Sequence, residues 1–283
     1  MTNSRDKLGY QLVRLLPKRA LTRAVGVLAC AEVPRRLRAP IYSGFATAVG
    51  ADLSQMDGEL HDFERFNAFF ARPLVEGSRP VQVEKGEIAS PADGFLSQAG
   101  RLADGLLLQA KGIEYSASEL LGAAYDGESL NDAIYSTVYL SPRDYHRVHF
   151  PFAGLVERVV HIGGELWPVN GLSVPFVRDL FIKNERLVAR ARLTDGRLAW
   201  IVMVGATVVG EMTCQNTGVQ MLDRRDSGTR CTDIAWQVDA GDEMGAFLMG
   251  STAVIVVQDP DRTLQLATAK EQPMQMGQPL WTR

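Results

Sequence analysis

The sequence predicts an α+β protein in which a helical N-terminal portion precedes a β-rich, mostly antiparallel body. Two observations predict this class. After Pro80 the chain consists of short apolar runs interrupted by Gly, Pro, Asn and Asp, a pattern typical of antiparallel strands and turns. Before residue 75, apolar residues recur at three- and four-residue steps, which is the spacing of one helix face. We therefore divide the 283-residue chain into portions 1–75 and 76–283.

The composition places the chain among folded globular proteins. A hydrophobic content of 46% over 283 residues suffices to bury a sizeable core, which excludes a disordered chain. No apolar run approaches the roughly 20 residues that span a bilayer, so we do not expect an integral membrane protein. Cys30, Cys214 and Cys231 are odd in number and far apart, so we expect neither a disulfide framework nor a zinc–thiolate site.

The first forty residues concentrate positive charge. They hold nine Lys or Arg and two acids, a net charge of +7 in a chain whose net charge is −3. Leucines and valines lie between these bases at largely helical spacing, and a basic amphipathic helix lies in the headgroup layer of an anionic membrane. Two other interpretations stay open: a helix packed on the body, or a signal peptide built on the short apolar stretch Ala24–Ala31. Nucleic acid binding is disfavoured, because few aromatic residues accompany the bases.

The elements follow in chain order. A helix is expected over 57–74, with an apolar stripe that we assign to the core, formed by Leu60, Phe63, Phe66, Phe69 and Phe70. Strands are expected at Gly94–Leu96, Leu106–Ala110, Ile134–Leu140, Gly154–Ile162, Leu187–Leu193, Leu198–Val209 and Ala253–Val257. Ser116–Leu121 and Val174–Asn184 are expected to be short helices.

Two of the four histidines, His146 and His149, lie three residues apart. A His-x-x-His pair binds zinc only with a third ligand, and no carboxylate or cysteine lies at an obvious helical spacing to supply one. The residues alone leave metal binding, a structural role and catalysis open for this pair.

Asp93 and Ser251 are the other candidate catalytic residues. Asp93 lies in a tight turn before Gly94, where an Asp commonly bonds its own backbone. The bond between Gly250 and Ser251 is suited to an N-to-O acyl shift, because glycine leaves its carbonyl unshielded and the serine hydroxyl lies next to it. An ordinary turn entering a strand is the simpler interpretation. Asp93, His149 and Ser251 together have the composition of a nucleophilic triad.

Combined, these motifs resemble the phosphatidylserine decarboxylases, in particular the bacterial pyruvoyl-dependent type. The resemblance runs from Leu16-Pro17-Lys18 through Phe66–Leu74, Pro91–Gly94, Gln109–Gly112, Ser141–His149, Val169-Asn170, Asn184–Arg186, Val204–Thr207 and Glu243–Gly245 to Gly250–Thr252. One position departs from the family pattern, which usually has Leu before Gly-Ser-Thr where this chain has Met249. Leu and Met have similar volume and apolarity, so we expect the chemistry to survive.

The resemblance implies a cofactor that the protein makes from itself. His149, oriented by Asp93, would deprotonate Ser251, whose oxygen attacks the Gly250 carbonyl. Cleavage would yield a β chain, 1–250, and an α chain, 251–283, that begins with a pyruvoyl group derived from Ser251. A Schiff base between this group and phosphatidylserine would lead to decarboxylation and release of phosphatidylethanolamine. His146 is the candidate for returning the proton or for positioning the substrate carboxylate.

The same resemblance implies the partners and the location. The substrate would be phosphatidylserine in an anionic membrane, and the enzyme would be a homodimer of cleaved protomers, each pairing its β chain with its α chain. It would lie as a peripheral protein on the cytoplasmic face of the bacterial inner membrane, with no metal and no nucleic acid partner. A plain serine hydrolase, a membrane-binding module without activity and a His146/His149 metalloenzyme are the rival interpretations.

Overall fold

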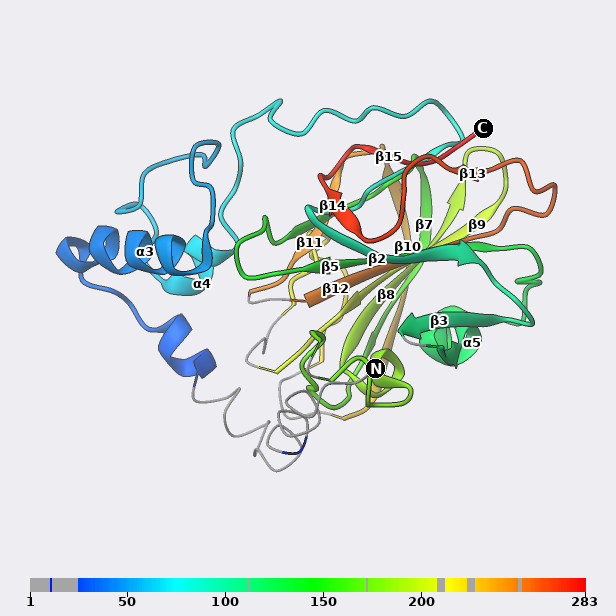
Figure 1. Ribbon diagram of the computed structural model, residues 1–283, viewed down its shortest axis with the longest axis horizontal. Coiled ribbons are helices and arrows are strands. Elements are labelled where there is room, and N and C mark those ends of the chain that lie inside the picture. The colour runs from blue at the N-terminus through cyan, green and yellow to red at the C-terminus, as the bar shows by residue number, and fades with distance from the viewer. Residues whose placement is uncertain are drawn as a thin grey trace.

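An eight-stranded antiparallel sheet forms the centre of the protein (Figure 1). The computed structural model describes residue 11 and residues 25–110, 112–171, 173–207, 212–222, 227–248 and 251–283. The strand order of the sheet is β10-β7-β8-β9-β12-β5-β2-β14. The bounds are β2 Gly94–Arg101, β5 Ile134–Leu140, β7 Gly154–Ile162, β8 Arg186–Leu193, β9 Leu198–Val204, β10 Thr229–Val238, β12 Ser251–Val257 and β14 Gln272–Met274. Every neighbouring pair is antiparallel, which confirms the predicted β-rich class.

Smaller elements surround this sheet. The remaining strands form three small sheets, which join β1 Ile88–Ala89 and β13 Gln265–Leu266 to β15 Pro279–Thr282, β3 Leu106–Ala110 to β4 Ile113–Ser116, and β6 Arg147–His149 to β11 Glu243–Ala246. The helices are α3 Arg35–Val49, α4 Phe66–Phe70, α5 Ala117–Leu121, α6 Leu180–Lys183 and the short 3-10 helix η1 Gly122–Ala124. Figure 1 shows α3 and α4 together at one side of the sheet.

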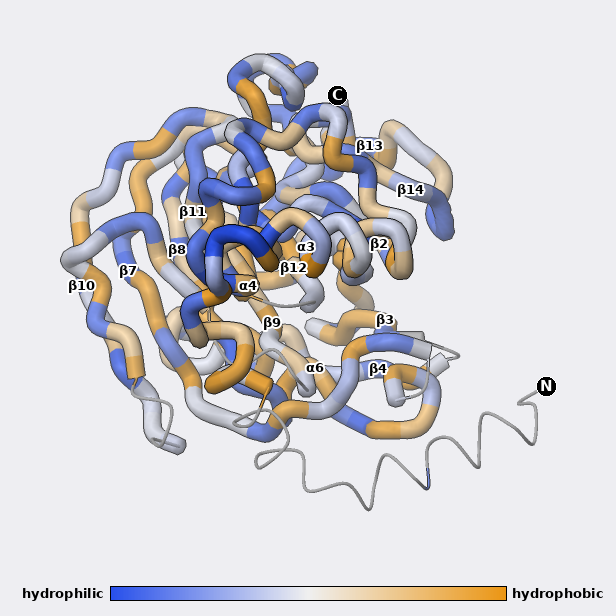
Figure 2. The backbone as a smooth tube through the Cα atoms, turned by 90° about the vertical axis from the view of Figure 1, so that its left-hand side faces the viewer, coloured by the Kyte–Doolittle hydropathy of each residue, from blue (hydrophilic) through white to orange (hydrophobic). Residues whose placement is uncertain are grey.

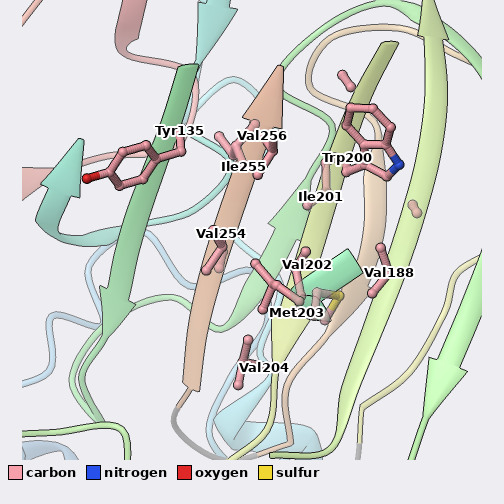
Figure 3. Packing of buried hydrophobic residues seen from close by; sticks show 14 of the residues in the cluster. Tyr135, Val188, Trp200, Ile201, Val202, Met203, Val204, Val254, Ile255 and Val256 are labelled. Carbon is pink, nitrogen blue, oxygen red and sulfur yellow. The ribbon is translucent and has the colours of Figure 1, made fainter. Parts of the chain in front are cut away.

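The core follows the two central strands, β9 and β12. Every residue of both strands is buried, and their apolar side chains belong to the main hydrophobic cluster (Figure 3). Their Val and Ile side chains suit a pleated, fully buried surface. Trp200 of β9 is completely buried, and its indole N–H donates to the Ala124 carbonyl at 2.9 Å. Along the outer strands β7 and β10, apolar and polar positions are interspersed instead (Figure 2).

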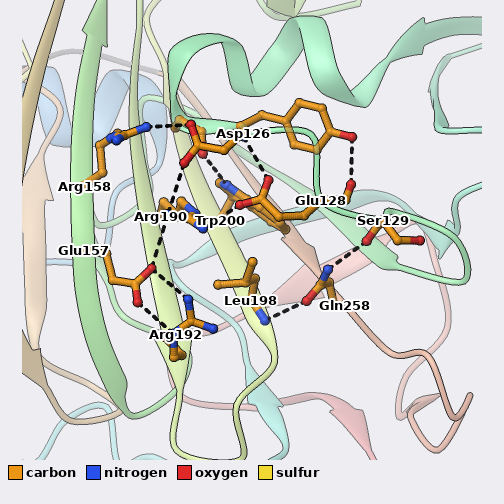
Figure 4. Close-up of polar contacts among 12 residues, drawn as sticks. Asp126, Glu128, Ser129, Glu157, Arg158, Arg190, Arg192, Leu198, Trp200 and Gln258 are labelled. Atoms are coloured by element: carbon orange, nitrogen blue, oxygen red, sulfur yellow. Dashed lines mark hydrogen bonds and ion pairs between the residues drawn. The ribbon is translucent and has the colours of Figure 1, made fainter.

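A network of ion pairs holds the loop after η1 against β7 and β8 (Figure 4). The Arg190 guanidinium lies 2.5 Å from a Glu128 carboxylate oxygen and 3.3 Å from one of Glu157. Arg158 pairs with Asp126 at 2.8 Å. Arg190 is largely buried, and networks of this kind contribute more to stability than isolated surface pairs.

The N-terminal portion has a small core of its own. Tyr42 and Phe45 of α3 pack against Phe66, Phe69 and Phe70 of α4, and the rings of Tyr42 and Phe69 stack with centroids 4.6 Å apart. Tyr42 and Phe69 are completely buried. The aromatic stripe is therefore core, as expected. Division of the chain at residue 75 remains a prediction.

The helix expected over 57–74 is wrong outside α4. Residues 57–65 form turns and extended chain, and only Phe66–Phe70 are helical. Gly58 has φ of 88°, and the Asp62 carboxylate accepts the Glu59 N–H at 2.8 Å. A left-handed glycine and a local side-chain turn both compete with helix formation, and the apolar spacing could not reveal them.

The other expected elements are mostly present. Strands expected at 106–110, 134–140 and 154–162 coincide with β3, β5 and β7, and the helix expected at 116–121 is α5. The strand expected over 198–209 is shorter, because β9 ends at Val204. The helix expected over 174–184 is wrong before Leu180, since Asp179 has φ of 57°, which interrupts helical backbone.

The basic segment 1–40 falls largely outside the described residues. In its described part, residues 25–30 are helical and α3 begins with Arg35, Arg36 and Arg38. Among the described residues, no helix is both long and apolar enough to cross a membrane.

Candidate active site

Strands β2, β5 and β12 bring the sequence-predicted residues to one edge of the sheet. Because β5 is antiparallel to both neighbours, it ends where they begin. Asp93 directly precedes β2, Ser251 is the first residue of β12, and the loop with His146 and His149 follows β5. All four predicted residues therefore lie at the same edge.

The loop after β5 is folded by a side-chain turn. The Asp144 carboxylate accepts hydrogen bonds from the backbone N–H and the hydroxyl of Ser141, both at 2.7 Å. The Asp144 N–H in turn donates to the Ser141 carbonyl at 2.9 Å. This turn reverses the chain, which continues through His146 into β6 and pairs there with β11.

Described residues on either side of the candidate cleavage bond contact this loop and the strand before it. The Phe247 N–H donates to the His146 carbonyl at 2.9 Å, and Ser251 lies opposite Leu140 in the ladder between β12 and β5. Gly250 itself lies outside the described residues. The two flanking contacts place the ends of segment 247–251 along the loop that carries the histidines.

Ser251 is completely buried, and its hydroxyl has no hydrogen-bond partner among the described residues. The neighbouring Thr252 hydroxyl is buried and unpartnered as well. A buried hydroxyl without a partner costs roughly 1–3 kcal/mol, so natural proteins rarely keep one without a functional reason. The unpartnered Ser251 hydroxyl is therefore available for chemistry.

Asp93 is held by an arginine. Arg79 donates from Nε to Oδ1 at 2.9 Å and from Nη2 to Oδ2 at 2.6 Å, and the Met276 N–H donates to Oδ1 at 2.8 Å. Both side chains are only 11% exposed. Gly94 makes this position possible, because a Cβ there would lie 2.4 Å from the Tyr139 carbonyl oxygen. The turn can therefore approach β5 closely.

His149 is buried with both ring nitrogens occupied. Nδ1 lies 2.7 Å from the Gly241 carbonyl oxygen, which only accepts, so Nδ1 carries the proton. Nε2 is then the acceptor for the Tyr145 hydroxyl at 3.0 Å. Burial lowers the pKa of His149, opposed by the Gly241 carbonyl and by nearby Glu243. The ring is a neutral base whose lone pair lies on Nε2.

Within the described residues, no hydrogen bond joins His149 to Asp93 or to Ser251. A backbone contact brings the turn of Asp93 close, since the His149 N–H donates to the Pro91 carbonyl at 2.8 Å. The negative charge of Asp93 also acts to raise the pKa of His149. The structure thus gathers the three residues at one edge, and their assignment as a triad remains a prediction.

His146 is completely buried against the N-terminal portion. Its ring lies on Phe70, with centroids 4.1 Å apart, and its Nδ1–H donates to the Asp144 carbonyl at 2.8 Å. Nε2 is buried and has no partner among the described residues. Burial lowers the pKa of His146 to about 3, and the charge of Arg72 contributes. Nε2 is therefore an open acceptor at neutral pH.

The two histidines occupy different surroundings. His146 faces Phe70 of α4, whereas His149 faces Tyr145 and Gly241. Across the part of the chain that the structure describes, no group of three or more His, Cys, Asp or Glu side chains is arranged to hold a metal ion.

Three residues at this edge were not singled out from the sequence: Arg72, Arg79 and Tyr145. Arg72 and Tyr145 lie inside stretches that carry the family resemblance, which was the available signal for them. Arg79 precedes Pro80 outside those stretches, and its contact with Asp93 spans 14 residues of chain. Only the folded structure reveals that contact.

Comparison with known proteins identifies the family of the chain. The family model described as phosphatidylserine decarboxylase matches residues 66–282. A protein of Anaeromyxobacter sp. (strain K) named phosphatidylserine decarboxylase proenzyme is 40% identical, covering 97% of this chain and 98% of that protein. Proteins of the same name from Myxococcus xanthus and Alcanivorax borkumensis are 35% and 41% identical, covering 96% and 89% of this chain and 97% and 88% of their own. These matches confirm the resemblance drawn from the sequence motifs, and the chain belongs to the phosphatidylserine decarboxylase family.

Proposed function

We propose that this protein decarboxylates phosphatidylserine to phosphatidylethanolamine, after it has cut its own chain between Gly250 and Ser251. Family membership supports the substrate and the reaction, and the relatives are named proenzymes, which implies processing. The main support for cleavage is the Ser251 hydroxyl at the start of β12. It is completely buried and has no hydrogen-bond partner among the described residues. A neutral His149 at the same edge supplies the base.

The cleavage step needs one proton acceptor. The proton of the Ser251 hydroxyl passes to Nε2 of His149 while the oxygen attacks the Gly250 carbonyl. The C–N bond then breaks as the nitrogen takes up the proton, which leaves an ester. Loss of the Ser251 α-proton breaks the ester and yields a carboxylate on Gly250 and a dehydroalanine. Hydrolysis of the dehydroalanine releases ammonia and leaves a pyruvoyl group.

The position of Ser251 fits a pyruvoyl group. A ketone has no donor to satisfy, so the site loses no hydrogen bond when the hydroxyl disappears. Such a group supplies a carbonyl that captures the substrate amine and withdraws the electrons freed as carbon dioxide leaves. His146 is our candidate for returning the proton to the α-carbon or for positioning the substrate carboxylate, because its Nε2 has no partner among the described residues.

The membrane location belongs to the same proposal. In the described part of the basic segment, Val27 and Leu28 are 67% and 72% exposed, and Leu37 and Ile41 of α3 are also exposed. Exposed apolar residues beside bases suit the headgroup layer of an anionic membrane. We place the protein as a peripheral protein on the cytoplasmic face of the bacterial inner membrane, where its substrate lies.

Mass spectrometry of the purified protein tests the cleavage. We expect two chains, 1–250 and 251–283, with the smaller one blocked at its N-terminus and reactive toward ketone reagents. Ser251→Ala, His149→Ala and Asp93→Asn should each leave the chain intact, whereas His146→Ala should cleave and decarboxylate poorly. A single intact chain with full decarboxylase activity would contradict the proposal.

A further inference from the structure

Arg72 is a buried arginine whose charge has no ion-pair partner in the part of the chain that the structure describes. It follows α4 and is 2% exposed. Among the described residues, no carboxylate oxygen lies within ion-pair distance of its guanidinium, and its Nε has no hydrogen bond. Its contacts are a weak hydrogen bond from Nη2 to the Arg143 carbonyl at 3.5 Å and the ring of Phe69, 5.7 Å from Cζ.

Two other arginines of low exposure, in contrast, have hydrogen-bond partners for their guanidinium groups. Arg186 donates from all three nitrogens to backbone carbonyls, which anchor it between α5 and α6. Arg79 donates hydrogen bonds from two of its nitrogens to the Asp93 carboxylate. Arg72 has no carboxylate partner among the described residues and only the one long hydrogen bond to a backbone carbonyl, although it is as buried as Arg186.

This arrangement costs stability. Burial lowers the pKa of Arg72, and the charges of Asp93 and Asp144 offset this only from a distance. An uncompensated buried charge is expensive, and proteins keep such groups where a ligand completes them. Arg72 and His146 both contact the loop after β5 and α4: Arg72 donates to the Arg143 carbonyl, and the His146 ring lies on Phe70, two residues before Arg72. Two polar side chains that have an unpartnered nitrogen among the described residues are thus held by the same loop and the same helix.

We propose that Arg72 binds the phosphodiester group of the phospholipid substrate. This inference rests on the proposed function and adds the residue that recognises the lipid headgroup. A guanidinium matches the geometry of phosphate oxygens with paired donors. Arg72 also follows α4 of the N-terminal portion and donates to Arg143 in the loop that carries the histidines, so it connects that portion to the loop of His146 and His149.

The substrate has a second anionic group, the carboxylate. The chemistry of the reaction indicates which of the two groups Arg72 binds. The carboxylate loses its charge as carbon dioxide leaves, so a cation held against it would stabilise the substrate more than the transition state. The phosphodiester keeps its charge throughout. A cation on the phosphodiester therefore lowers KM without slowing the chemical step.

Steady-state kinetics on a short-chain phosphatidylserine dispersed in detergent tests this assignment. With Arg72→Gln we expect KM to rise about tenfold to a hundredfold, the loss of a charge-assisted hydrogen bond, while kcat changes less than about threefold. Arg72→Lys, which keeps the charge and loses the paired donors, should raise KM by a smaller factor. Arg262→Gln removes an exposed arginine, 65% exposed, and should leave both constants unchanged.

Two headgroup probes separate the anionic groups. Glycerophosphoethanolamine carries the phosphate without the carboxylate, and serine carries the carboxylate without the phosphate. Glycerophosphoethanolamine should inhibit the wild-type enzyme competitively and inhibit Arg72→Gln and Arg72→Lys at least tenfold more weakly. Serine should act equally on all three.

Several results would overturn the assignment. An unchanged KM in both Arg72 variants, or a wild type that glycerophosphoethanolamine does not inhibit, shows that Arg72 does not bind the phosphate. Unchanged inhibition by glycerophosphoethanolamine in the Arg72 variants, together with weakened inhibition by serine, assigns Arg72 to the carboxylate instead. If Arg72→Gln fails to fold, judged by thermal melting, the lysine variant and the wild-type inhibition decide. A wild type that makes no phosphatidylethanolamine contradicts the proposed function, and it also overturns the assignment of Arg72, which rests on that function.

Discussion

At the residue scale, His146 and His149 have the same tautomer and different neighbours on the basic nitrogen. Both donate Nδ1–H to a backbone carbonyl, which leaves the lone pair on Nε2. In His149 the Tyr145 hydroxyl occupies Nε2, whereas in His146 no described residue does. The Tyr145 hydroxyl must therefore leave Nε2 of His149 before that nitrogen can accept the Ser251 proton, whereas no such displacement is needed at Nε2 of His146.

Tyr145→Phe tests how Tyr145 affects the base. The Tyr145 hydroxyl donates to the neutral form of His149, so its removal should raise the pKa of that ring. His149 must be neutral to accept a proton, so the midpoint of the cleavage rate against pH should move upward as well. Cleavage followed by electrophoresis across pH measures this. Tyr125→Phe, whose hydroxyl bonds the Glu128 carbonyl away from the site, is the matched control. Coincident profiles for all three proteins would rule out the effect.

Arg79→Gln tests the ion pair with Asp93. Both partners are 11% exposed, and removing one leaves a buried carboxylate with only the Met276 N–H. We expect the free energy of unfolding to fall by about 3 kcal/mol, measured in urea on an uncleaved Ser251→Ala background. Arg192→Gln breaks the more exposed pair with Glu157 and should cost less than about 1 kcal/mol. Equal losses in the two variants would show that burial does not strengthen the Asp93 pair.

At the scale of elements, the sequence predicted strands best where apolar runs are continuous and bounded by turn residues. β5 and β7 have their predicted bounds for this reason. β10 was missed because its residues are mostly exposed and polar positions interrupt its pattern, as expected of an edge strand. The candidate site shows the same division. Its motif residues were predictable, but the Arg79–Asp93 and Tyr145–His149 contacts depend on side-chain geometry that no spacing encodes.

Strand β12 makes a further prediction at this scale, that the two chains stay together after cleavage. The α chain would begin with β12, which pairs with β5 on one side and β9 on the other and is buried throughout. Native size-exclusion chromatography should therefore elute both chains in one peak, and only denaturant should separate them. Ile255→Ala, at 2% exposure, should lower the denaturant midpoint of that separation, since such truncations cost about 2–5 kcal/mol. Release of the small chain in native buffer would refute this.

At the scale of the whole molecule, the basic segment 1–40 precedes the candidate active-site residues in the chain. The basic residues concentrate in the first forty, while the remainder of the chain is acidic. Between them, α4 places Phe70 on His146 and Arg72 beside the histidine loop. The portion that we assign to the membrane surface thus contacts the candidate active site directly. A lipid headgroup that stays in the interface would reach the reacting centre without the protein crossing the bilayer.

Removal of residues 1–30 tests this arrangement. The deletion takes away six of the nine bases in the first forty residues, and each base near an anionic leaflet contributes about 1 kcal/mol. We expect liposome binding and activity on bilayer phosphatidylserine to fall more than tenfold, while activity on a short-chain soluble analogue changes little. Salt screens the ionic part within about 8–10 Å and leaves the apolar part, so high salt should release the full-length protein only partly and detergent completely. Equal losses on the bilayer and the soluble substrate would show that the segment packs on the body and supports its fold instead.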